Sequence, residues 1–154
     1  MIELIGTIGI TASSVVLFGY WFRYTCLLIL SAKTTRDYAA EVATANQLSF
    51  LQVQAQLRQQ TPVEIDALEK ALDRDYAIVT SLLKHASGAS AAQGALEKRM
   101  LEIDYRLMRA WYRVSRSFSA AAARQAVEEM SLVVAHFANA MGEQTSAAAA
   151  AAAA

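Results

Sequence analysis

The sequence predicts an all-α protein in which one N-terminal transmembrane helix continues into a three- or four-helix antiparallel bundle. Three observations predict this fold. A nearly uninterrupted apolar run opens the chain, apolar residues recur beyond it at helical spacings of three and four, and the 154 residues include one proline and six glycines. So few helix-breaking residues favour helices over turn-rich β structure. We expect a membrane anchor with an apolar juxtamembrane helix over residues 1–32, a helical bundle domain over 33–142 and a low-complexity tail over 143–154.

The apolar run has the length of a membrane span. From Leu4 to Phe22 there are nineteen residues without a formal charge, bounded by Glu3 and Arg23. A helix of that length measures about 28 Å, close to the roughly 30 Å of the bilayer's hydrocarbon core. Aromatic residues cluster at the Arg23 end, where an interfacial aromatic belt would lie. A cleaved signal peptide and a buried core helix are the alternatives, but no basic residue precedes the run as in a signal peptide.

Basic residues predict the orientation of the span. Arg23, Lys33 and Arg36 follow it, whereas Glu3 precedes it. Because positively charged flanks stay in the cytoplasm, we expect the N-terminus outside and the bundle in the cytoplasm, at a membrane such as the bacterial inner membrane.

Two parts of the anchor predict contacts with other proteins. Gly6, Gly9 and Ser13 share one helical face, and small residues let a second helix approach closely in lipid. Residues 24–32 remain apolar beyond the expected interface, where water would penalise their exposure. We therefore predict that a partner protein covers this juxtamembrane segment, through Tyr24, Leu27, Leu28 and Leu30.

The first half of the bundle domain predicts two helices. Lys33 to Gln60 contains neither glycine nor proline, so the anchor helix is expected to continue through it with little or no break. Thr61-Pro62-Val63-Glu64 predicts a new helix start, with a capping threonine, proline at the first helical position and glutamate closing a capping box. The apolar seam of this new helix is Ile65, Leu68, Leu72, Tyr76, Val79 and Leu83. A loop is expected over residues 86–94.

The second half predicts one or two further helices. Ala95 to Phe118 carries two apolar stripes, so we expect it to pack on more than one face. The stripes are Leu96, Met100, Ile103, Leu107, Trp111, Val114 and Phe118, and Leu101, Tyr105, Met108 and Tyr112. Ser119 could cap a fourth helix from Ala120 to Met141, with Gly142 as its C-terminal stop, although a continuous or kinked helix remains open.

A row of arginines is the best candidate for recognition. Arg106, Arg109, Arg113 and Arg116 share one helical face, and guanidinium groups in a row suit anionic lipid headgroups, phosphate or an acidic protein partner. The alternative is pairing inside the bundle, because the preceding helix carries a complementary acidic set, Glu64, Asp66, Glu69, Asp73 and Asp75. A formal net charge of zero disfavours nucleic acid as a partner.

No pattern in the sequence predicts catalysis. The single cysteine, Cys26, rules out an intramolecular disulfide and a cysteine-based metal site. We find no nucleotide-binding motif, no Glu-x-x-His pair and no small-molecule site, and so expect no enzymatic activity, no metal and no cofactor. Haem bound by His85 or by His136 with Met141 is a redox-carrier alternative.

One short resemblance adds a further alternative. Ile2-Glu3-Leu4 resembles the start of the N-terminal helix of type IV pilins, over three residues. It implies a pilin-like filament subunit, although Arg23 and the aromatic cluster interrupt the helix where the pilin pattern continues.

The sequence therefore predicts a single-pass, membrane-anchored helical bundle that serves as a structural or accessory subunit, for assembly or scaffolding, of a larger membrane-associated complex. Its partners would be membrane lipid and other protein subunits, in a homo- or hetero-oligomer. The main alternative is a module that binds anionic lipid or phosphate through the arginine row.

Overall fold

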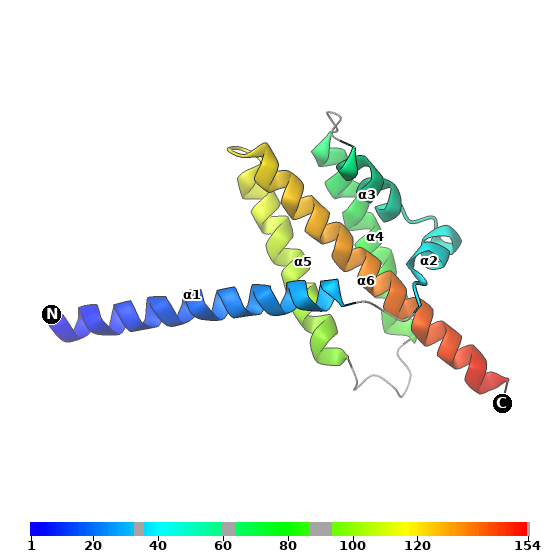
Figure 1. Ribbon diagram of the computed structural model, residues 1–154, viewed down its shortest axis with the longest axis horizontal. Coiled ribbons are helices and arrows are strands. Elements are labelled where there is room, and N and C mark those ends of the chain that lie inside the picture. The colour runs from blue at the N-terminus through cyan, green and yellow to red at the C-terminus, as the bar shows by residue number, and fades with distance from the viewer. Residues whose placement is uncertain (33–35, 60–63, 87–93, 154) are drawn as a thin grey trace. The chain divides into compact units, whose positions relative to one another are not determined.

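A computed structural model describes residues 1–32, 36–59, 64–86 and 94–153. Figure 1 shows that the regular elements are all helices, which confirms the predicted all-α class for this part of the chain. The chain divides into two compact units, Met1–Lys33 and Thr34–Ala154.

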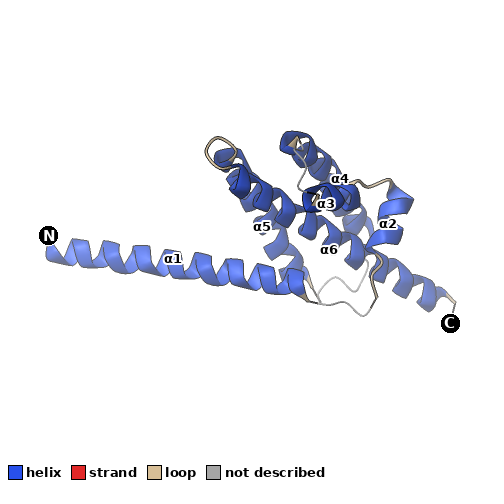
Figure 2. Ribbon diagram, turned by 45° about the horizontal axis from the view of Figure 1, so that its top comes forward, coloured by secondary structure: helices blue, strands red, loops and turns tan. Residues whose placement is uncertain are grey.

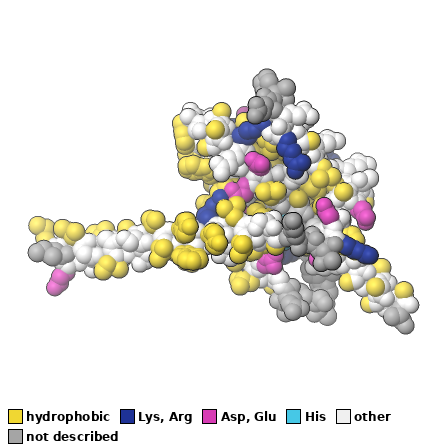
Figure 3. Space-filling model, viewed as in Figure 1, with side chains coloured by type: hydrophobic (Ala, Val, Ile, Leu, Met, Phe, Trp, Pro, Cys, Tyr) yellow, Lys and Arg dark blue, Asp and Glu magenta, His cyan; other side chains and the backbone are white. Residues whose placement is uncertain are grey.

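The first unit is the helix α1, Ile2–Ser31. Its hydroxyl groups turn back onto its own backbone: Thr7, Thr11, Ser14 and Thr25 each donate to the carbonyl four residues earlier, at 2.8 Å. Polar side chains satisfied in this way are compatible with a hydrocarbon environment, where water cannot bond to them. Among the described residues, one helix, Glu3–Ser31, is long and apolar enough to cross a membrane. Hydrophobic side chains cover its length in Figure 3.

The second unit is built around its last helix. The helices are α2 (Ala39–Asn46), α3 (Phe50–Arg58), α4 (Ile65–Ala86), α5 (Ala95–Ser115) and α6 (Ala120–Ala152). Each of α2 to α5 packs on α6, and α5 runs antiparallel to both α4 and α6 (Figures 1 and 2). Val127, Met130, Val134 and Phe137 of α6 are almost fully buried, as expected for a central helix.

The prediction of one helix continuing from the anchor to Gln60 is wrong. The backbone leaves α1 at Ala32, whose ψ of 124° is extended, and α2 ends at Gln47, whose φ of 52° is left-handed. There the Leu48 amide donates to the Ala43 carbonyl and the Gln47 amide to the Thr44 carbonyl, the two bonds of a Schellman motif. Glycine usually holds such a position, so the sequence carried no ordinary signal for the break.

A buried carboxylate holds the corner between α2 and α3. Asp75 of α4 is 1% exposed, and its Oδ2 accepts bonds from the Ser49 backbone amide at 2.7 Å and the Ser49 hydroxyl at 3.0 Å. The N-terminus of α3 leaves backbone donors without helical partners, and a carboxylate is well suited to accept from this end. Burial of Leu48 and Phe50 beside this corner anchors the turn in the core.

Most of the remaining predicted boundaries agree with the structure. The seam of α4 is buried at Leu68, Leu72, Val79 and Leu83. The predicted cap at residues 61–63 and most of the predicted loop, residues 87–93, lie outside the described residues. α5 ends at Ser115 rather than Phe118, and Ser119 caps α6 as predicted, its hydroxyl accepting from the Ala122 amide at 3.2 Å.

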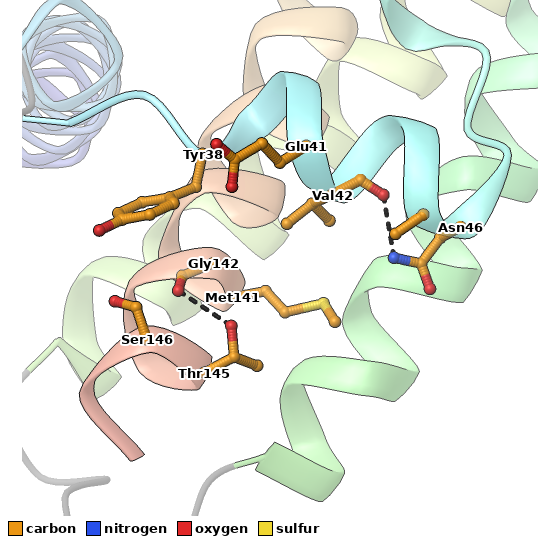
Figure 4. Close-up of a pocket in the computed structure, with 9 residues that line it drawn as sticks. Tyr38, Glu41, Val42, Asn46, Met141, Gly142, Thr145 and Ser146 are labelled. Atoms are coloured by element: carbon orange, nitrogen blue, oxygen red, sulfur yellow. Dashed lines mark hydrogen bonds between the residues drawn. The ribbon is translucent and has the colours of Figure 1, made fainter. Parts of the chain in front are cut away.

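Gly142 is not the predicted helix stop, because α6 continues to Ala152, through the expected low-complexity tail. The glycine instead permits a close approach. A Cβ placed on Gly142 would lie 2.2 Å from the Cβ of Tyr38, so no larger residue fits without displacing α2. Figure 4 shows Tyr38 and Val42 next to Gly142, at a shallow depression of about 340 Å³ between α2 and α6. The Asn139 side chain strengthens this contact by accepting from the Tyr38 amide at 2.7 Å.

Candidate interaction surfaces

The helix α5 has three faces with different chemistry. One face is buried and comprises Leu101, Tyr105, Met108 and Tyr112. The second carries the arginines, and the third is apolar and exposed. At 100° per residue these faces occupy separate sectors of the helix, so each can be assigned a role by itself.

The buried face of α5 is joined to α4 by aromatic and polar contacts. The Tyr105 ring stacks on the Tyr76 ring with centroids 3.8 Å apart. The Tyr105 hydroxyl donates to Asp73 Oδ1 at 3.1 Å, and the Tyr112 hydroxyl donates to Asp66. Burial, together with the neighbouring carboxylate, raises the pKa of Tyr105 well above its usual range and that of Tyr112 to about 12.

Two of the four predicted arginines also face α4. Arg109 donates through Nε to Glu69 Oε1 at 3.2 Å and pairs through Nη2 with Asp73. Arg116 Nη1 lies 3.5 Å from Asp66 Oδ1. The hydrogen bond from Tyr112 is the largest influence on Asp66 and, with Arg116, lowers the pKa of its carboxyl group. For these two arginines the structure supports pairing inside the bundle, the alternative that the acidic set on α4 had suggested.

The other two predicted arginines point elsewhere. Arg106 and Arg113 are exposed, and so is Arg99, so that exposed arginines recur every seven residues. A spacing of seven places the three side chains along one edge of the helix. We call Arg99, Arg106 and Arg113 the outer arginine row. The single predicted row of arginines is therefore two rows, one bonded to α4 and one at the surface.

An apolar stripe on α5 is exposed, contrary to the prediction that both stripes are packed. Six side chains of this stripe are 45–76% exposed: Leu96, Ile103, Leu107, Trp111, Val114 and Phe118. We call them the outer stripe. α6 and α4 cover the adjacent face of α5 and leave this one open within the second unit. The rings of Trp111 and Phe118 contact each other edge to face, with centroids 6.1 Å apart. Hydrophobic side chains gather at this edge of the bundle in Figure 3.

The predicted surfaces of α1 can be located on the helix. A Cβ placed on Gly6 or Gly9 meets nothing within 4 Å, and Ser13 is exposed, so the small-residue face is open to a neighbouring helix. Near the other end of α1, Tyr24, Leu27 and Leu28 are 45–57% exposed. Leu30 lies in the last turn of the helix. Whether partners cover these surfaces stays a prediction.

Both histidines make local contacts. His85 is exposed near the end of α4, with Nδ1 2.7 Å from the Ser81 carbonyl oxygen. His136 Nε2 on α6 lies 3.1 Å from Glu97 Oε1 on α5. Met141, the other predicted haem ligand, lines the shallow depression in Figure 4. Within the described ranges, no group of three or more histidine, cysteine or acidic side chains lies close enough together to hold a metal ion.

The sequence analysis named Asp75 as a possible partner of the arginines and missed its bonds to Ser49, and it did not identify Asp104 as a buried carboxylate. Asp75 lies between Leu72 and Val79 at seam spacing, and Asp104 lies likewise between Leu101 and Met108. Both carboxylates are buried, at 1% and 0% exposure. The signal was available, because a charged residue in register with an apolar seam must be buried, and buried charges usually have a structural role.

Comparison of the chain with protein-family models, with curated proteins and with solved structures found no match.

Proposed function

We propose that this protein is a single-pass membrane subunit whose α1 helix anchors the bundle and contacts other protein subunits, as a structural or accessory component of a larger membrane-associated complex. The observation that carries the proposal is the exposed apolar surface of α1, which extends past Arg23 to Leu28. Lipid accounts for the part before Arg23. A protein partner accounts for the part after it.

The chemistry of α1 supports both halves of this proposal. Its apolar length matches a bilayer, and its hydroxyl groups are bonded to its own backbone. Phe18, Tyr20, Trp21, Phe22 and Tyr24 cluster within two helical turns, in contact ring by ring. Aromatic rings at this level mark the interface between hydrocarbon and water.

The bundle supports a structural rather than a catalytic role. Its buried polar groups are used to fix helices: Asp75 holds the α2–α3 corner, Asn139 holds the start of α2, and Glu69 accepts from the partly exposed Arg109 to join α4 to α5. Groups used in this way stabilise one arrangement of helices. We infer that the bundle presents a fixed surface to its partners.

The direct test is extraction of the native protein in mild detergent, followed by size measurement and identification of stoichiometric partners. We expect an assembly larger than the 16.7 kDa chain in its micelle. A photoreactive amino acid at Leu28 should then crosslink to a second protein chain, whereas the same group at Leu51, an exposed residue of α3, should not.

A monomeric extract, with the Leu28 group crosslinked to lipid, to detergent or within its own chain, would contradict the proposal. The Leu51 variant is the matched control, because both positions are exposed leucines on helices and differ in the unit that carries them.

A further inference from the structure

We propose that the outer stripe and the outer arginine row of α5 form a docking surface for an anionic membrane. The apolar side chains would enter the upper acyl region, and the arginines would bind phosphate groups of the lipid headgroups. This inference adds a second membrane contact and rests on the proposed function in one respect, the membrane attachment through α1.

The apolar part of the surface is long and continuous. It runs from Leu96 along α5, over about five turns of helix, into the turn that follows the helix, and ends in the aromatic pair of Trp111 and Phe118. Isolated exposed leucines are ordinary on soluble proteins, but a contiguous row of this length is typical of a surface that binds something.

The charged residues beside the outer stripe indicate which kind of partner this surface can bind. Arg99, Arg106 and Arg113 lie at helical angles of about 80–120° from the centre of the stripe, along one edge. Long arginine side chains at the edge of an apolar face can reach headgroups while the apolar residues enter lipid. Three exposed arginines lie beside one partly buried carboxylate, Glu102, so the net charge of this edge is basic. The surface complements an anionic membrane in both polarity and sign.

The different environments of the arginines of α5 also support docking to an anionic membrane. Arg109 and Arg116 are bonded to acidic residues of α4, so these two arginines contribute to packing within the bundle. Arg106 and Arg113 are exposed on the side nearer the outer stripe. Because the bundle is covalently joined to α1, an anchored bundle meets the bilayer at a high effective concentration, so weak contacts suffice for docking.

The two tryptophans of the chain allow a direct test. Trp21 reports on α1, and Trp111 reports on the outer stripe. The full chain is reconstituted in vesicles with roughly one part phosphatidylglycerol to two parts phosphatidylcholine, some of it brominated near the top of the acyl chains. In the Trp21→Phe variant we expect lipid bromine to quench Trp111 fluorescence strongly, and iodide on both sides of the bilayer to quench it weakly.

Charge is tested by replacement of the outer arginines. In the Trp21→Phe background, Arg106→Gln with Arg113→Gln should reduce the bromine quenching of Trp111 by about half or more, as should vesicles of phosphatidylcholine alone. High salt should act in the same direction. The matched control, Arg58→Gln with Arg74→Gln, removes two exposed arginines of α3 and α4 and should leave the quenching unchanged.

Three outcomes would overturn the inference. Trp111 quenched by iodide and not by bromine would mean that the stripe faces water. Trp111 protected from both quenchers would mean that a protein, including a second copy of this chain, covers the stripe. Equal quenching of Trp111 in the outer-arginine and control variants would mean that the outer arginines do not contribute to docking.

The Trp111→Phe variant tests α1 separately. Loss of bromine quenching of Trp21 would contradict the proposed membrane span of α1 and would not change the conclusion drawn from Trp111.

Discussion

Asp75 illustrates how one side chain fixes the connection between two short helices. Its Oδ2 accepts two bonds from Ser49 at the point where α3 begins, and the carboxylate is buried. We expect Asp75→Ala to lower the free energy of unfolding of the bundle by about 1–3 kcal/mol, because the partly buried amide and hydroxyl of Ser49 lose their acceptor. Urea unfolding followed by circular dichroism measures this change.

A conservative variant of Asp75 separates the effect of the hydrogen bonds to Ser49 from the effect of the negative charge. Asp75→Asn keeps an oxygen acceptor and should lose less stability than Asp75→Ala. Glu128→Gln, at an exposed position of α6, serves as the control and should change stability by less than about 0.5 kcal/mol. Equal stability of the wild type and Asp75→Ala would show that the corner forms without this carboxylate.

Tyr112 and Asp66 make the stability of the bundle depend on pH at both extremes. Burial and the Asp66 carboxylate raise the pKa of Tyr112 from 10.0 to about 12, so the folded state holds this proton more tightly than the unfolded state. The stabilisation is complete below about pH 10 and is lost as pH rises towards 12. The pKa of Asp66 is lowered from 3.8, so its contribution is present above that value and is lost as pH falls below it.

The alkaline effect can be isolated in one variant. We expect Tyr112→Phe to lose less stability than the wild type between about pH 10 and pH 12, measured as the shift of the urea midpoint. Tyrosinate absorbance in the two proteins should differ by one group that titrates near 12. If that group titrates near 10, the hydroxyl is not bonded to Asp66 in the folded protein.

At the scale of elements, Gly142 sets the distance between α2 and α6. A Cβ at this position would lie 2.2 Å from the Tyr38 Cβ, which is fixed to the backbone and cannot swing away. We expect Gly142→Ala to destabilise the bundle by about 1–3 kcal/mol through overpacking, even though alanine favours a helix over glycine by about 1 kcal/mol. The thermal midpoint of the full chain in detergent measures the change.

Gly9→Ala is the corresponding control. A Cβ on Gly9 meets nothing within 4 Å, so this change should leave the unfolding of the bundle unaffected. A bundle that is more stable with Gly142→Ala than with glycine would mean that α2 does not sit as closely on α6 as described.

The two arginine rows of α5 should respond differently to the same substitution. Arg109→Gln removes bonds to Glu69, which is buried, and to Asp73, and we expect a loss of about 1–2 kcal/mol of stability. Arg113→Gln, at an exposed position four residues further, should change stability by less than about 0.5 kcal/mol. Urea unfolding compares the two, and equal effects would contradict the assignment of the rows.

At the scale of the whole molecule, the distribution of charge around α1 predicts topology. Arg23 and Arg36 lie on the bundle side of the span and Glu3 on the other side, so we expect the bundle in the cytoplasm. Protease added to intact cells should leave the bundle whole, and protease added to inverted membrane vesicles should degrade it. Degradation in intact cells with protection in inverted vesicles would establish the opposite orientation.

Features that depend on neighbours along the chain could be predicted from the sequence alone. The apolar length of α1, the seam of α4 and the Ser119 cap of α6 follow from composition, from spacings of three and four and from a single hydroxyl group. The acidic set on α4 also identified internal pairing as an alternative for Arg109 and Arg116. Such features are local, because they depend on residues that are near one another in the sequence.

Other features depend on tertiary contacts, which no local pattern specifies. The exposed stripe of α5 is at least as apolar as the buried one, so the positions of α4 and α6 determine that Tyr105 is buried and Trp111 exposed. The break at Gln47 depends on Leu48 entering the core and on Asp75 of a later helix, and these contacts override the helical propensity of a segment without glycine or proline. Gly142 likewise acquires its role from Tyr38, more than a hundred residues away along the chain. Burial depends on contacts between segments distant in sequence, and spacing along one helix cannot supply that information.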